Sequence, residues 1–385
     1  MSDAADHLGL VEAHVAGAGS LLTSPAVRGF PAAAPGLAEL LAALPELTGR
    51  VADVSGSAGG GALAAGEARV SVLEPSYAAF RAARHRFVGE PRVAVSAGLP
   101  WDLDAEAFDV VLALPPGDRG SDRVRAEIEA CARALAPGGS AYLAMHKDLG
   151  AKRYERFAGE AFAEVEVIAR SKGWRVARLR RPQPGGAGGG GGASSLPADA
   201  ERQPWRRYEA LGRSWWALPG VFAARALDAG SAELLTALDE LGNASLAGAD
   251  VLDLGCGTGV LAARVRDAGA RSVWALDDDL AAVRSSRRNL AGADARVLHS
   301  DLDAALEPDR RFDVVVANPP FHVGKQVRLA LSRAFVRAAA ARLRPGGELL
   351  LVANRALPYE RELERWRSFD TLRESAAFKV LRARS

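Results

Sequence analysis

The sequence predicts an α/β protein made of two tandem copies of one mostly parallel sheet. First, the same order of strand-like and helical segments occurs twice in the 385 residues. Second, short β-branched runs alternate with helical stretches rich in Ala, Arg and Leu, as in doubly wound sheets. Third, residues 182–199 are rich in Gly, Pro and Ser and read as a flexible linker between the copies.

The duplication is visible at four pairs of matching segments. The pairs are 51–59 with 251–259, 70–74 with 273–277, 108–116 with 312–320, and 136–139 with 344–347. Self-similarity of this kind indicates that one structural unit occurs twice. We therefore expect domains at 1–181 and 200–385, joined by the linker.

The second copy predicts its strands most clearly. Five β-branched runs lie at 250–254, 272–276, 296–299, 313–317 and 348–352. The last two strand-like runs, 371–374 and 378–382, are too close together for a helical crossover, so they must form an antiparallel hairpin. We expect a parallel sheet that ends in antiparallel strands.

Composition predicts a soluble cytoplasmic protein. Hydrophobic residues make up 49% and charged residues 25% of the chain. No apolar run approaches the roughly 20 residues that span a bilayer, and Asp3 and Asp6 stand where a signal peptide is basic. The cysteines, Cys131 and Cys256, are far apart and have no metal-ligand spacing, so we expect neither a disulfide nor a metal.

Basic residues are clustered although the net charge is only +2. Residues 170–181 and 325–344 each contain six basic and no acidic residues. Such clusters suit RNA phosphates, and they equally suit a solvated Arg-rich face.

A glycine-rich turn after the first strand of the second copy predicts a nucleoside cofactor site. Asp253 ends the strand, and Gly255, Cys256, Gly257 and Gly259 follow before a helical run. Glycines lack a Cβ and so admit a ligand close to the backbone. Cys256 is expected to be a small, adaptable residue rather than a nucleophile.

Three carboxylates follow successive strands and extend this prediction. Asp253 is placed to meet a cofactor ammonium directly or through water, Asp277 to accept from ribose hydroxyls, and Asp301 to meet an adenine amino group. Val260 stands where a dinucleotide fingerprint has its third glycine, so that match is incomplete.

The tetrapeptide Asn318-Pro319-Pro320-Phe321 ends a later strand and predicts the chemistry. The Asn318 side-chain oxygen and the Pro319 carbonyl are suited to accept both hydrogens of a planar NH2 group. The prolines fix φ and contribute no competing N–H, and Phe321 is suited to stack on a base. His322 contacts either the substrate or only its own loop.

Together the glycine turn and this tetrapeptide resemble the S-adenosylmethionine and catalytic sites of class I (Rossmann-like) methyltransferases that modify exocyclic or amide nitrogens. With 218–222, Leu227-Asp228, Gly230-Ser231 and the tandem architecture, the chain is similar to the bacterial ribosomal RNA small subunit methyltransferase C family. That resemblance is strong from about Trp215 onward. It implies S-adenosylmethionine-dependent methylation of guanine N2 in 16S rRNA, with Phe222 and His322 near the substrate.

The first copy is predicted to be catalytically degenerate. Leu114 stands opposite Asn318, Ser55 and Ser57 opposite two turn glycines, and Gly117 opposite Phe321. The acids and glycine that persist are Asp53, Gly59 and Glu74. Because these residues persist, cofactor binding in the first copy is not excluded. The Cβ atoms added at Ser55 and Ser57 nevertheless disfavour it. We expect this half to recognise RNA or to support the active half.

Several alternatives stay open at this point. The same loop suits 23S rRNA guanine, DNA adenine N6 or a protein glutamine amide. A non-catalytic RNA-binding or ribosome-assembly protein is the alternative of another class, disfavoured because Asn318 is retained beside an intact glycine turn. The expected partner is ribosomal RNA or the small ribosomal subunit, and a monomer is compatible with the sequence.

Overall fold

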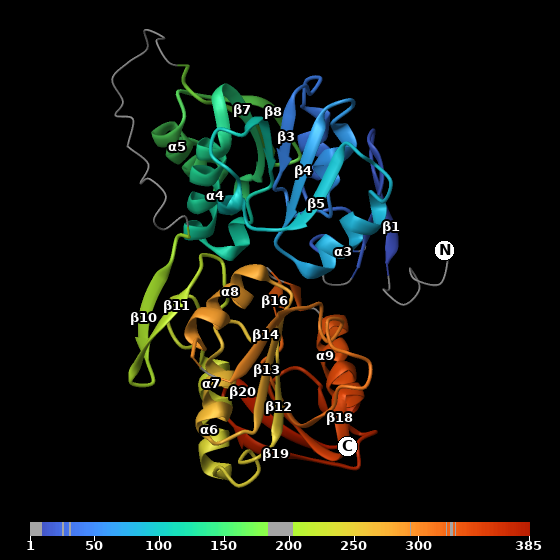
Figure 1. Cartoon of the computed structure of the whole chain (residues 1–385), viewed down its shortest axis with the longest axis vertical. Coiled ribbons are helices and arrows are strands. Elements are labelled where there is room, and N and C mark those ends of the chain that lie inside the picture. The colour runs from blue at the N-terminus through green and yellow to red at the C-terminus, as the bar shows by residue number, and fades with distance from the viewer. Residues whose placement is uncertain are drawn as a thin grey trace. The chain divides into compact units, whose positions relative to one another are not determined.

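The computed structural model describes residues 10–24, 27–30, 32–183, 203–292, 294–320, 322–323, 326–327 and 329–385, of which 322–323, 326–327 and 329–332 are described by their backbone alone. The chain divides into two compact units, Met1–Pro204 and Trp205–Ser385 (Figure 1). The predicted linker lies outside the described residues from residue 184 onward.

The first unit contains a seven-stranded sheet with the order β5-β4-β3-β6-β7-β9-β8. Its strands are β1 Val11–Val15, β2 Gly19–Thr23, β3 Arg50–Asp53, β4 Arg69–Glu74, β5 Val93–Ala97, β6 Phe108–Ala113, β7 Leu135–His146, β8 Glu164–Ser171 and β9 Trp174–Arg180. Its helices are α2 Leu37–Ala42, α3 Tyr77–Arg86, α4 Ser121–Ala134 and α5 Ala151–Ala161, with 3₁₀ turns η1 Gly60–Ala64, η2 Pro100–Asp102, η3 Gly117–Arg119 and η4 Lys147–Leu149.

The second unit repeats this arrangement with the order β14-β13-β12-β15-β18-β20-β19. Its strands are β10 Arg206–Ala210, β11 Arg213–Ala217, β12 Asp250–Leu254, β13 Ser272–Asp277, β14 Ala295–His299, β15 Phe312–Ala317, β16 His322–Val323, β17 Gln326–Val327, β18 Leu343–Asn354, β19 Ser368–Glu374 and β20 Phe378–Arg384. Its helices are α6 Ala229–Leu241, α7 Val260–Asp267, α8 Leu280–Asn289, α9 Leu329–Arg342 and α10 Glu360–Leu363.

Strand pairing confirms the predicted fold class in both units. In the second, β12 lies between β13 and β15, and all three are parallel. The closing strand β20 is antiparallel to β19, as the spacing of the last two runs predicted, and it is also antiparallel to β18. The first unit pairs β7, β9 and β8 in the same manner.

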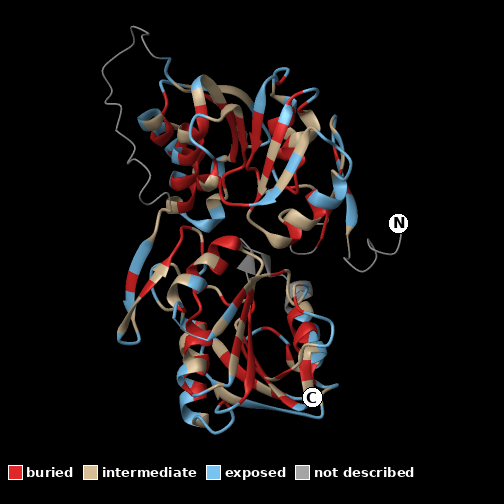
Figure 2. Cartoon of the chain, viewed as in Figure 1, coloured by how far each residue is buried: buried red, intermediate tan, exposed pale blue. Residues whose placement is uncertain are grey.

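The central strands are buried because helices cover both faces of each sheet. All five residues of β12 are buried, including Asp250 at its amino end. Asp250 accepts from Arg271 and Arg344 at 2.7 Å each, and the hydrogen bond from Arg271 holds the pKa of its carboxyl well below the ordinary value. Figure 2 shows the buried residues concentrated along the inner strands of each unit. The ion cluster around Asp250 lies at the amino edge of the sheet, opposite the strand ends that carry the predicted site.

Each sheet is preceded by a short antiparallel hairpin, β1–β2 in the first unit and β10–β11 in the second. The sequence patterns did not predict these hairpins. Among the helices that the structure describes, none has the length and apolar character needed to cross a membrane.

Candidate active site

The predicted site residues of the second unit gather at the carboxyl edge of its parallel strands. Asp253 lies in β12, Asp277 ends β13, and Asn318 directly follows β15. β12 lies between the other two strands and is parallel to both. Their carboxyl ends therefore lie side by side at one edge of the sheet, which is where doubly wound sheets bind ligands. Asp301 follows β14 after one residue, at the same edge.

Asp253 has one carboxylate oxygen occupied and one available. Its Oδ2 accepts from the Ala262 backbone N–H at 2.9 Å, while the buried Oδ1 has no hydrogen-bond partner in the described part of the chain. Burial raises the pKa of this carboxyl to about 7. A buried acceptor without a partner is unusual, and a cationic group such as an ammonium is the partner that would satisfy it.

The three turn glycines differ in what surrounds them. All have positive φ, of 80° at Gly255, 55° at Gly257 and 83° at Gly259. A Cβ at Gly255 would lie 3.0 Å from the Phe335 ring, and one at Gly259 would lie 2.9 Å from the Ser286 hydroxyl. A Cβ at Gly257 would meet no described atom within 4 Å. Gly255 and Gly259 therefore allow close packing of protein, whereas Gly257 faces open space.

Asp277 holds the glycine turn as well as facing the edge. Its Oδ2 accepts from the Gly257 N–H at 2.9 Å, and its Oδ1 accepts from the Asp279 N–H at 2.9 Å. A carboxylate oxygen has further lone pairs, so these bonds leave capacity for ribose hydroxyls. Asp277 and Asp301 are both partly exposed, and their cofactor roles stay predictions.

A side chain that we did not predict fastens the turn to the rest of the unit. Asn289, the last residue of α8, donates to the carbonyls of Thr258 at 2.9 Å and Trp216 at 2.8 Å and accepts from the Trp216 N–H. Cys256 is buried beside the Ser286 hydroxyl at 3.2 Å. Burial raises the pKa of its thiol well above the ordinary value, which agrees with a packing role.

Asn318 is held in one orientation by its amide nitrogen. Nδ2 donates to Asp228 Oδ2 and to Ser231 Oγ, each at 2.9 Å. Because a carboxylate only accepts, the nitrogen must face Asp228, and both amide hydrogens are then used. The Asn318 oxygen is left as the acceptor, close to the Gly230 backbone.

The remaining loop residues are described to different degrees. Pro319 is buried and Pro320 is exposed. Phe321 lies outside the described residues, and only the backbone of His322 is described. Phe222 is 66% exposed, which is unusual for a large apolar side chain. Its exposure suits stacking on a planar ligand.

In the first unit, apolar residues stand at the positions that correspond to Asp228, Ser231 and Asn318. Residues 36–41 read Gly-Leu-Ala-Glu-Leu-Leu and residues 230–235 read Gly-Ser-Ala-Glu-Leu-Leu. The partner aromatics also correspond, because a Cβ at Gly36 would meet Trp174 and one at Gly230 would meet Phe378. The equivalents of Asp228, Ser231 and Asn318 are thus Ala34, Leu37 and Leu114, which are buried in one hydrophobic cluster. The first unit has apolar side chains at all three positions, as expected if the polar side chains of the second unit act together.

Asp53, the counterpart of Asp253 in the first unit, has both carboxylate oxygens occupied. Asp53 accepts from the Ser55 N–H at 2.9 Å with one oxygen and from the Gly61 N–H at 2.8 Å with the other. Glu74 accepts from the Gly59 N–H at 2.8 Å. Leu99, two residues after β5, takes the place of Asp301 and is fully buried. The predicted loss of the first site therefore has a structural basis.

Comparison with known proteins agrees with this geometry. The sequence profile of the methyltransferase small domain matches residues 20–178 and again 213–382. The chain belongs to the methyltransferase small domain family. The double match also agrees with the duplication seen in the sequence and in the two sheets.

Individual relatives are consistent with this family. The chain is 37% identical over 183 residues to proteins named ribosomal RNA small subunit methyltransferase C from Yersinia pestis (strain Pestoides F) and Yersinia pseudotuberculosis serotype O:1b (strain IP 31758). Each alignment covers 46% of this chain, and the chain spans about half the length of these curated relatives, 51%. The predicted resemblance to the methyltransferase C family is confirmed.

A solved structure is similar over the full length. The T. thermophilus 16S rRNA N2 G1207 methyltransferase (RsmC), in complex with AdoMet and guanosine, has a TM-score of 0.84 and 36% identity, covering 99% of each chain. The tandem arrangement of the two folds is thus shared with that protein. Asp228, Ser231 and Asn289 are residues of this candidate site to which the sequence analysis assigns no role.

Proposed function

We propose that this protein transfers a methyl group from S-adenosylmethionine to the exocyclic N2 of a guanine in 16S rRNA. The observation that carries the proposal is the orientation of Asn318. Its amide nitrogen is bound by Asp228 and Ser231, so its oxygen is presented as an acceptor at the strand edge that also holds the glycine turn. The names of the relatives at 36–37% identity support the same substrate.

The residues at this edge fit S-adenosylmethionine. The partnerless buried oxygen of Asp253 suits the ammonium of the methionine moiety, and the open space beside Gly257 suits a bulky ligand. Asp277 is placed for the ribose and Asp301 for the adenine, with Gly255, Cys256 and Gly259 shaping the turn. When bound, this group supplies an electrophilic methyl attached to a sulfonium.

The chain itself contributes positioning rather than acid–base chemistry. We assign the Asn318 oxygen and the Pro319 carbonyl as acceptors of the two N2 hydrogens. Both hydrogens are then in plane, and the lone pair of the nitrogen points out of the ring plane toward the donor methyl. Orientation of this kind contributes up to roughly 7–11 kcal/mol in well-aligned reactions. No strong base is needed, because the nitrogen releases its proton after transfer.

The surrounding residues complete the assignment. Phe321, and Phe222 with its exposed ring, are suited to stack on the guanine, while His322 lies next along the loop. Pro320 restricts the loop, since its φ is fixed. Asp228 and Ser231 are positioning residues that act through Asn318.

The two halves have separate roles in this proposal. Residues 200–385 form the catalytic domain, residues 182–199 the linker, and residues 1–181 a degenerate domain that contacts RNA or supports the active half. The buried Ala34, Leu37 and Leu114 support the loss of catalysis in the first half. We place the protein in the cytoplasm with the small ribosomal subunit or its rRNA as partner.

The decisive experiment incubates the purified full chain with methyl-labelled S-adenosylmethionine and ribosomal particles from a strain that lacks the activity. Nucleoside analysis of each RNA is expected to place the label in N2-methylguanosine of 16S rRNA. Label in 23S rRNA, in DNA adenine or in a protein glutamine would reassign the substrate. No label in any of these, with cofactor binding intact, would favour a non-catalytic assembly protein.

A further inference from the structure

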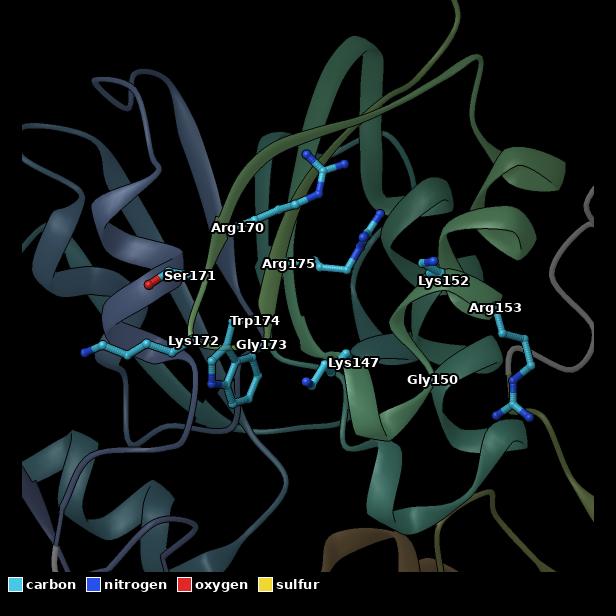
Figure 3. A pocket seen from close by; sticks show the side chains of 10 residues that line it. All are labelled: Lys147, Gly150, Lys152, Arg153, Arg170, Ser171, Lys172, Gly173, Trp174 and Arg175. Carbon is cyan, nitrogen blue, oxygen red and sulfur yellow. The ribbon is translucent and has the colours of Figure 1, made fainter.

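A pocket of about 450 Å³ lies in the first unit. It is formed by the β8–β9 turn, by η4 and by the start of α5. Figure 3 shows its lining side chains, six of which are basic and none acidic. The lining residues are Lys147, Gly150, Lys152, Arg153, Arg170, Ser171, Lys172, Gly173, Trp174 and Arg175.

Most of these cations have no anionic partner. Arg175 is paired with Glu155 at 2.7 Å. The other five are exposed, and none of them forms an ion pair with any residue that the structure describes. The nearest acid of the edge, Asp148, lies 3.5 Å from His146 instead. Unpaired cations gathered in a concave surface create a positive field that favours a polyanion.

The backbone that carries this charge is firmly placed. Trp174 stacks edge-on to His146 with ring centroids 5.3 Å apart, and it lies directly over Gly36, where a Cβ would come within 2.4 Å of its ring. Gly173 has a φ of 85°, and a Cβ there would come equally close to the His146 ring. The turn that presents Lys172 therefore has a defined position.

The second unit provides an internal control, because the two edges can be matched residue by residue. His146 pairs with Trp174 across β7 and β9, as Asn354 pairs with Phe378 across β18 and β20. The ion pair between Arg175 and Glu155 recurs as Lys379 with Glu360 at 2.5 Å. Tyr154-Glu155-Arg156 likewise corresponds to Tyr359-Glu360-Arg361.

At the five unpaired positions the catalytic unit has lost or neutralised the charge. The matches are Lys147 with Arg355, Lys152 with Leu357, Arg153 with Pro358, Arg170 with Glu374 and Lys172 with Ala376. Arg355 and Glu374 bind each other at 2.7 Å. The first unit thus has five cations without an ion-pair partner among the described residues, whereas the second unit has one neutral ion pair at the matching positions. The fold therefore does not require this positive charge.

We propose that this pocket is a binding site for the phosphodiester backbone of the RNA substrate. The inference rests on the proposed function for the identity of the polyanion. Phosphate oxygens are the main contacts of proteins with nucleic acids, and Lys and Arg are their usual donors. The degenerate unit thereby holds RNA with the edge that the catalytic unit uses for chemistry.

The test is a charge reversal designed from the other copy. In the full chain, Arg170→Glu with Lys172→Ala installs the residues of the catalytic unit, and the new carboxylate is also expected to bind Lys147. The matched control is Arg84→Glu with Arg69→Ala, which makes the same change in charge at exposed positions elsewhere in the unit. Binding is measured to a 16S rRNA transcript between 50 and 200 mM salt, roughly the range over which phosphate contacts weaken.

The pocket variant is expected to bind about tenfold more weakly at physiological salt, with the slope of log Kd against log salt reduced by about 2. The control should stay within roughly twofold of the unaltered chain, and S-adenosylmethionine should bind to both variants normally. Equal losses in pocket and control variants, or an unchanged salt slope in the pocket variant, would overturn the proposal. Equal weakening on duplex DNA and on the rRNA would reject RNA as the specific partner.

This experiment separates the two proposals. If the unaltered chain binds 16S rRNA without methylating it, the proposed function fails, while the pocket is still decided by the variants. If the chain methylates 16S rRNA and the pocket variant binds it normally, only the pocket assignment fails. A chain that does not bind rRNA contradicts both.

Discussion

Asn318 Nδ2 lies 2.9 Å from Asp228 Oδ2, an oxygen that also caps helix α6 by accepting from the Ser231 N–H at 2.9 Å. One carboxylate oxygen therefore caps a helix and orients the amide of Asn318, the residue to which we assign catalysis. The helix start is rigidly coupled to the strand end of β15. The orientation of the amide is thus part of the fold and not a property of the loop alone.

The first prediction separates these two duties of Asp228. Serine is as good a helix cap as aspartate, but its shorter side chain does not reach Asn318. Asp228→Ser is expected to keep thermal stability and cofactor affinity while lowering kcat by about 10- to 100-fold, since small misplacements have effects of that size. The control is Ser76→Ala, which removes the cap of α3 in the first unit and should lower stability by about 1 kcal/mol without changing kcat.

The second prediction reverses the donor and the acceptor. Asn318→Asp places two carboxylates about 2.9 Å apart, and their repulsion should turn the loop residue away and abolish transfer near pH 7. Adding Asp228→Asn supplies an amide that donates to the new carboxylate and should restore part of the activity. Steady-state methylation of rRNA by the single and double variants checks this. An inactive double variant that binds cofactor normally would contradict it.

The third prediction concerns pH. The pKa of Asp253 is raised to about 7 from an ordinary 3.8, chiefly by burial. The fold therefore favours the protonated form, and the stability that this form provides is complete below about pH 4 and is lost as pH rises through 7. A shift of this size corresponds to an upper limit of roughly 4 kcal/mol. The unfolding midpoint without cofactor should fall more steeply between about pH 4 and 7 for the unaltered chain than for Asp253→Asn, and parallel curves would refute the assignment.

The fourth prediction uses the two copies as each other's control. Both oxygens of Asp53 accept backbone N–H groups, whereas Asp253 has one oxygen without a partner. Titration calorimetry should give one S-adenosylmethionine per chain. Asp253→Asn should remove that binding, and Asp53→Asn should leave its stoichiometry and affinity unchanged. Two bound molecules per chain would show that the first unit retains a working site.

Much of the strand order was predictable because each strand is indicated by a short run of neighbouring residues. The β-branched runs at 250–254 and 313–317 became β12 and β15 within one residue. Leu114 opposite Asn318 predicts loss of function in the first copy, and this stays a prediction. The antiparallel pairing of β19 with β20 followed from the spacing of the two runs alone.

The missing parts depend on contacts between distant residues. Asp228 and Asn318 are separated by 90 positions in the sequence. Asn289 and Trp216, which are hydrogen-bonded, are separated by 73 positions. The prediction treated the turn glycines as equivalent, yet only Gly257 faces open space, because the packing of Phe335 and Ser286 is invisible in the chain order. The sequence leaves two interpretations of the basic cluster at 170–181, and it does not show that Arg175 and Arg178 pair with Glu155 and Glu166.

The apolar replacement of Ala34, Leu37 and Leu114 has an evolutionary consequence. Their side chains fill one hydrophobic cluster, so restoring any one polar residue would bury a polar group without a partner, at roughly 1–3 kcal/mol. Restoring the Asn318 network in the first copy would require all three changes, and Ser55, Ser57 and Leu99 would still differ from the second copy. Each single reversion is therefore expected to destabilise the first unit, which disfavours a stepwise return to the polar network.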